Sequence, residues 1–134
     1  SGARGDLAGT DHILWTRHKR TPYVPSPLLY RDHLYFLRHY QAILTRLHGK
    51  TGEEPTGPFR LPGLLNLYAS PVAAAGRIYF TDQQGASLVL PDSPEPEPLA
   101  LNQLDDVFNA SPAIVGDSIL LRGKRFLYRL AEPE

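Results

Sequence analysis

Histidines and adjacent carboxylates are the residues of this chain whose types best suit chemistry, but their spacing does not form a site. No His-x-His or His-x3-His pair stands near a carboxylate, so surface or turn positions are expected rather than a metal centre. The adjacent acids 105–106 and 53–54 would face opposite sides of a strand, so we expect solvated turns rather than a catalytic pair. The five histidines are His12, His18, His33, His39 and His48.

The serines that recur along the chain favour a structural role over nucleophilic catalysis. Ser26, Ser70 and Ser111 each precede a proline, and none lies in a Gly-x-Ser-x-Gly frame. Their hydroxyl groups can satisfy backbone groups at the start of an inner strand. The chain has no cysteine. We therefore expect no catalytic residue, no bound cofactor and no metal site, and a protein that is not an enzyme.

The same serines mark a repeat that predicts the fold. An aromatic residue, a Ser-Pro pair and a hydrophobic strand eight residues after the serine occur three times, with serine spacings of 44 and 41 residues. A repeat of about 40 residues made of short strands is typical of a β-propeller blade. The predicted fold is all-β, with three four-stranded antiparallel blades in one repeat domain. The expected segments are 1–20 (closing strand), 21–63, 64–104 and 105–134 (blades one to three).

Glycine and proline turns bound the strands that we expect within these blades. An additional strand, 12–18, stands alone before the first repeat. The expected blade strands are 26–30, 34–39, 43–47, 59–61, 71–75, 78–81, 87–90, 99–101, 112–115, 119–122 and 126–130.

The strand count predicts how the ring would close. The third repeat has three strands and the N-terminal segment has one, so we expect the strand around Trp15 to complete the third blade, within one chain or between chains. The expected interface residues are Leu14, Trp15, Phe126 and Tyr128. A chain of 134 residues is too short for a typical complete propeller of at least about four blades. We therefore expect homo-oligomerisation, with a six-bladed homodimer favoured.

Charge is uneven along a chain whose net charge is zero. Residues 12–50 carry a charge of +6 and residues 51–117 a charge of −7. This pattern allows complementary surfaces between copies or two differently charged solvated faces. Zero net charge argues against nucleic acid as a partner, and no apolar run is long enough to span a membrane.

These residues resemble the pyrroloquinoline-quinone-like (PQQ-like) β-propeller repeat family, whose blade motif reads Ala-x-Asp-x-x-Thr-Gly-Lys-x-x-Trp. The segment 47–53 looks like the centre of that motif, and Thr10 and Trp15 look like its tail, whereas His48 and Thr56 depart from its Asp and Trp. The resemblance implies a propeller fold. It is closer to the non-catalytic scaffold members than to the quinoprotein dehydrogenases, since no metal cluster or catalytic aspartate stands in a matching context. It also suggests a bacterial periplasm or cell envelope for the parent protein. The chain shows no signal peptide, and its lack of methionine is consistent with an internal fragment or a designed sequence.

Three functions stay open at this point. The leading one is a non-enzymatic scaffold that assembles with itself into a closed ring. The alternative is a module that binds a ligand or a protein through loops on one face, with Arg31, His33, Gln83 and Lys124 as candidate contacts. The third is a quinone- or metal-dependent enzyme.

Overall fold

A computed structural model describes residues 2–38 and 41–132. Over these residues the chain is all-β, with three antiparallel sheets of four, four and three strands, none of them closed on itself. Within the described ranges no helix is present. His39, expected at the end of a strand, lies outside them.

Each repeat forms one sheet, whose strands pair with their sequence neighbours. The first sheet contains β1 (Leu28–Tyr30), β2 (His33–Leu37), β3 (Ile43–His48) and β4 (Phe59–Arg60). The second sheet contains β5 (Val72–Ala74), β6 (Arg77–Thr81), β7 (Ala86–Pro91) and β8 (Ala100–Gln103). The third sheet contains β9 (Ala113–Val115), β10 (Ser118–Arg122) and β11 (Leu127–Leu130). The ends of these strands that the structure describes lie within two residues of those expected from the turn residues.

The expected strand at residues 12–18 is not formed, which corrects that prediction. Residues 13–18 pair with no strand in the described part of the chain. Residues 14–18 nevertheless alternate as an extended segment does, with Trp15 and Arg17 partly buried and Leu14, Thr16 and His18 exposed. The alternation that predicted a strand is therefore present, but its hydrogen-bond partner is not.

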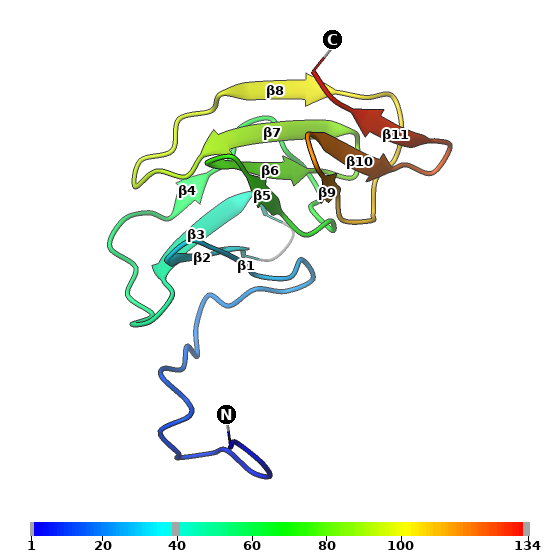
Figure 1. Ribbon diagram of the computed structural model, residues 1–134. Coiled ribbons are helices and arrows are strands. Elements are labelled where there is room, and N and C mark those ends of the chain that lie inside the picture. The colour runs from blue at the N-terminus through cyan, green and yellow to red at the C-terminus, as the bar shows by residue number, and fades with distance from the viewer. Residues whose placement is uncertain (1, 39–40, 133–134) are drawn as a thin grey trace.

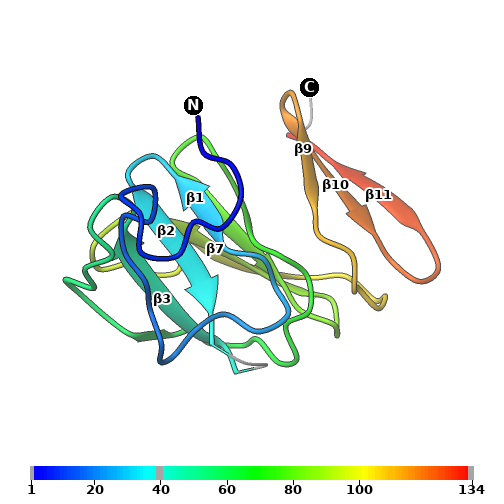
Figure 2. The same cartoon turned by 90° about the horizontal axis from the view of Figure 1, so that it is seen from below.

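The sheets lie in sequence order around their first strands, since β1 neighbours β5 and β5 neighbours β9. The N-terminal segment lies at one end of this row and β11 at the other (Figures 1 and 2). The first and second sheets enclose the main core, where alternate side chains of paired strands meet. Its most buried members include Leu37, Leu44, Phe80 and Leu88.

Candidate functional site

The three recurring serines form a hydrogen-bonded ladder from one sheet to the next. The backbone N–H of Ser26 donates to the hydroxyl of Ser70 across 2.8 Å. The N–H of Ser70 donates in the same way to the hydroxyl of Ser111 across 2.9 Å. The proline after each serine has no N–H of its own to satisfy. The expectation that these hydroxyl groups satisfy backbone groups is confirmed for Ser70 and Ser111.

The ladder ends with one unused group at each end of the row. Among the described residues, the Ser26 hydroxyl accepts no hydrogen bond and the Ser111 N–H donates none. Both residues are exposed, whereas Ser70 between them is partly buried. The chain therefore presents an acceptor at one end and a matching donor at the other.

The N-terminal segment is fixed on the first sheet by its only tryptophan. The indole N–H of Trp15 donates to the carbonyl oxygen of Gly49 across 3.0 Å. Its ring lies over Gly52, where an added Cβ would come within 2.6 Å of Trp15 Cδ2. Gly52 also has a φ of +72°, which L side chains rarely adopt. This contact fixes the position of the extended residues around Trp15.

A second contact fixes the same segment through charge. Glu54 accepts hydrogen bonds from Arg17 at 2.7 Å and from Arg38 at 2.6 Å. Arg38 is buried and also donates to the Thr45 hydroxyl at 2.6 Å. These pairs join the basic and acidic parts of the sequence within one chain. Leu14, directly before the anchored Trp15, is 75% exposed.

The opposite end of the row is the free edge of β11, which is the last strand in the order of the third sheet. The N–H of Gly123 donates to the carbonyl of Phe126, so these two residues form a hydrogen-bonded pair of the β10–β11 ladder. Such pairs alternate in an antiparallel sheet. The backbone groups of Leu127 and Arg129 are therefore directed outward, toward the free edge.

Asp106 holds the turn that leads into β11. Its carboxylate accepts hydrogen bonds from the backbone N–H groups of Val107, Arg125 and Phe126 and from the Tyr128 hydroxyl. Burial on its own raises the pKa of this carboxyl, but the hydrogen bonds outweigh it and lower the pKa from 3.8 to about 2. Asp106 therefore stays ionised and keeps the turn rigid.

The expectation of solvated acids is correct for Asp105 and wrong for Asp106. The Asp105 side chain is fully exposed and pairs with Arg125 at 2.9 Å. Asp106 is only 6% exposed, because the turn closes over it. Glu54 is also largely covered, whereas its neighbour Glu53 is exposed on its own turn.

The four expected closure residues are not brought together within one chain. Trp15 bonds to Gly49 at the end of β3 and Leu14 precedes it, whereas Tyr128 belongs to β11 and Phe126 directly precedes that strand. The N-terminal segment and β11 lie apart, beside the first and the third sheet (Figure 2). Phe126 is 56% exposed and packs edge-on against Tyr128. Closure within a single chain is therefore not what the structure shows, and only pairing between chains stays a prediction.

The four candidate ligand residues also divide into two pairs. Arg31 and His33 lie where β1 joins β2, whereas Gln83 and Lys124 lie in the turns after β6 and β10. A strand's two ends face opposite edges of its sheet, so these turns lie on opposite sides of the molecule. This corrects the expectation of one shared face.

A hydrogen-bonded network lies beneath the first pair. The Tyr35 hydroxyl makes a short hydrogen bond to Asp92 and accepts another from Arg46 at 3.0 Å. Burial and the Asp92 hydrogen bond raise the pKa of Tyr35 to about 12. Burial and the Arg46 charge lower the pKa of His33. Asp92 also forms an ion pair with Arg31 at 3.2 Å. These side chains are therefore one another's polar partners, and their contacts link the first two sheets.

The second pair contacts the segment that precedes the third sheet. Gln83 Nε2 donates to the side-chain oxygen of Asn109 at 2.8 Å. The Lys124 N–H donates to the carbonyl of Val107 at 2.9 Å. No local sequence pattern indicates these contacts, because Asn109 lies in the repeat after that of Gln83 and Val107 lies 17 residues before Lys124.

The described residues contain no group of three or more His, Asp or Glu side chains placed to hold a metal ion. No helix long and apolar enough to cross a membrane is found in that part of the chain. A scan against protein-family models finds no match for this chain. No curated protein matches it either. The resemblance to the PQQ-like repeat family therefore stays a prediction.

Proposed function

We propose that this chain is a non-enzymatic scaffold, that its three sheets are blades of a PQQ-like β-propeller, and that two copies join into a closed six-bladed ring. The observation that carries the proposal is the serine ladder. It passes from sheet to sheet in one direction, and among the described residues it ends in an unused donor and an unused acceptor.

A second copy would satisfy both ends of the ladder. The Ser111 N–H of each copy would donate to the Ser26 hydroxyl of the other, repeating the bond that joins neighbouring sheets within the chain. Two such junctions close a ring of two copies with no end left over. Interfaces related by a twofold axis are self-complementary in this way.

The free edge of β11 supports the same arrangement. An unpaired strand edge favours association with another strand, and the chain carries an unpaired extended segment at 13–18. Trp15 and Arg17 hold one side of this segment on the first sheet, while Leu14 remains exposed on the other. The segment could therefore add a fourth strand to the third sheet of another copy without leaving its own chain.

The experiment is the solution mass measured by light scattering after size exclusion, for the wild-type chain and two variants at one position. Leu127→Pro removes an N–H that points outward from β11, so pairing at that edge is blocked while the β10–β11 ladder is kept. Leu127→Ala is the matched control, because it shortens the same exposed side chain and keeps the N–H.

We expect the mass of two chains for wild type and Leu127→Ala, and the mass of one chain for Leu127→Pro. A wild-type chain that has the mass of one chain at its highest soluble concentration would overturn the proposal. A two-chain mass that persists in Leu127→Pro would instead rule out β11 as the closing edge.

A further inference from the structure

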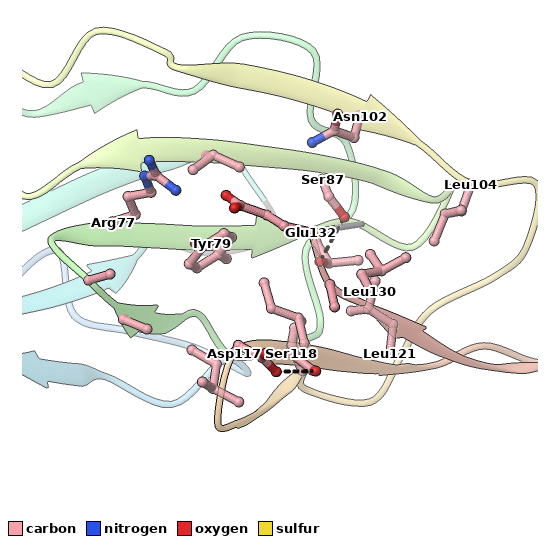
Figure 3. A pocket seen from close by; sticks show the side chains of 18 of the residues that line it. Arg77, Tyr79, Ser87, Asn102, Leu104, Asp117, Ser118, Leu121, Leu130 and Glu132 are labelled. Atoms are coloured by element: carbon pink, nitrogen blue, oxygen red, sulfur yellow. Dashed lines mark hydrogen bonds between the residues drawn. The ribbon is translucent and has the colours of Figure 1, made fainter. Parts of the chain in front are cut away.

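A cavity of about 690 Å³ lies between the second sheet and the third (Figure 3). The first and second sheets instead share a buried core. Volumes between about 300 and 1,000 Å³ are usual for small-molecule sites. This cavity lies between two sheets of the same chain. Binding within it therefore does not depend on ring closure.

A comparison of equivalent positions in the first two repeats explains why the buried end of the cavity is not filled. Leu37 and Leu44 are register partners across β2 and β3, and both are fully buried against the second sheet. The equivalent partners across β6 and β7 are Thr81 and Ser87. Two leucines that fill one interface are thus replaced by two hydroxyl groups, which bond to each other at 2.9 Å.

The segment before each serine explains the outer part. Leu64 precedes Ser70 by six residues and is buried in the core between the first two sheets, and Phe59, the register partner of Leu44 across β3 and β4, packs against that core. The residue six before Ser111 is Asp105, which is exposed, and the register partner of Ser87 across β7 and β8 is Asn102, which lines the cavity. Neither is an apolar side chain like its counterpart in the preceding repeat.

The walls of the cavity differ in chemistry. The third sheet contributes the apolar side chains of Ile114, Ile119, Leu121 and Leu130. The second sheet contributes the hydroxyl pair at the buried end. Exposed charged residues of both signs lie at the solvent side, namely Arg77, Asp117 and Glu132.

We propose that this cavity binds a small neutral molecule with a flat apolar body and one hydrogen-bond acceptor. The body would pack on the aliphatic wall of the third sheet. Each hydroxyl group has one hydrogen to donate, and the bond between Thr81 and Ser87 uses only one of the two. The remaining hydrogen can be donated to a carbonyl or ether oxygen of the ligand. Among the described lining residues, no charged group lies at the buried end, so an ion would have no partner there.

Prodan, a neutral naphthyl ketone whose fluorescence reports both polarity and hydrogen bonding to its carbonyl, is a suitable probe. The test titrates the intact chain with Prodan and with the anionic dye anilinonaphthalene sulfonate. We expect saturable binding of one Prodan per chain with blue-shifted emission, and weaker binding of the anionic dye. An absence of saturable Prodan binding would overturn the proposal, as would tighter binding of the anionic dye.

Two variants and a control locate the probe. Thr81→Leu/Ser87→Leu restores the two leucines found in the preceding interface and should weaken Prodan binding at least tenfold. Ser87→Leu alone serves if the double variant does not fold. Leu29→Ser removes an exposed leucine elsewhere and should leave binding unchanged. Prodan binding that is equal in the wild-type and leucine variants would also overturn the proposal.

Discussion

Removing one hydroxyl group from the serine ladder tests the contact on which the proposed ring depends. Ser70→Ala deletes the acceptor of the Ser26 N–H, while the backbone of the second sheet keeps every bond of its own. Ser111→Ala deletes the next acceptor in the same way. Ser26→Ala deletes a hydroxyl that accepts nothing from the described residues, so it is a control built into the repeat.

The expected magnitudes follow from the burial of each donor. A hydrogen bond contributes about 0.5–1.5 kcal/mol net, and the lower half of that range applies where water can reach the donor. Ser26 is exposed, so Ser70→Ala should cost about 0.5–1 kcal/mol in the monomeric chain, or roughly 2–4 °C in Tm. Ser26→Ala should cost nothing there.

Association should show the opposite pattern. If two junctions each use a Ser26 hydroxyl, Ser26→Ala removes both bonds, about 1–2 kcal/mol in all, which weakens dimerisation about five- to thirtyfold. The assays are thermal unfolding at a dilution where the chain is monomeric, and sedimentation equilibrium for the dimer. A Ser26→Ala monomer as destabilised as Ser70→Ala would refute the ladder's direction, and unchanged dimerisation of Ser26→Ala would refute the proposed junction.

Three further changes test the contacts that hold the sheets and their ends. Gly52→Ala places a Cβ 2.6 Å from the Trp15 ring, so it should displace the ring toward water and shift the emission maximum of this single tryptophan to the red. Gly116→Ala is the control, because the space around Gly116 is open and the emission should not change. Leu44→Ala should lower the free energy of unfolding in urea by about 2–5 kcal/mol, because the side chain is fully buried; a loss below about 1 kcal/mol would contradict close packing. The pKa of Asp106 is lowered to about 2, so its stabilisation is present above pH 3.8 and is lost as pH falls toward 2. The difference in Tm between wild type and Asp106→Asn should therefore narrow on acidification and would contradict this reasoning if it widened.

Local patterns in the sequence predicted the sheets well, because their causes are local. Glycine at a turn, as at Gly85 with a φ of +93°, allows a backbone that other residues rarely adopt. Alternation along β7 buries Ala86, Leu88 and Leu90 and leaves the residues between them partly covered. Such signals lie within a few residues of each other, so they can be recognised without knowing which strand is the partner.

Only the part of the site that recurs in each repeat could be predicted from the sequence. The serines stand at fixed spacings, so their structural role could be inferred, although not that each serves the preceding sheet. The burial of Asp106 depends on a turn 19 and 20 residues away, and no local pattern reports it. The separation of Arg31 from Gln83 follows from which turn each occupies, and charge or residue type alone did not distinguish the two sides.

The second and third repeats keep the same hydrogen-bonded link between the turn and the preceding segment, although the residues that form it differ. In the second, Asp82 in the turn accepts a hydrogen bond from the N–H of Leu65 in the preceding segment, at 2.9 Å. In the third, the acid stands in the preceding segment as Asp106, and Gly123 occupies the turn position. A Cβ on Gly123 would lie 2.2 Å from the Asp106 carboxylate, so the glycine is required once the acid has changed sides. The same bridge is thus built with donor and acceptor exchanged. It joins the preceding segment to the turn in both repeats, but the aspartate stands at a different position, where a sequence motif would not find it.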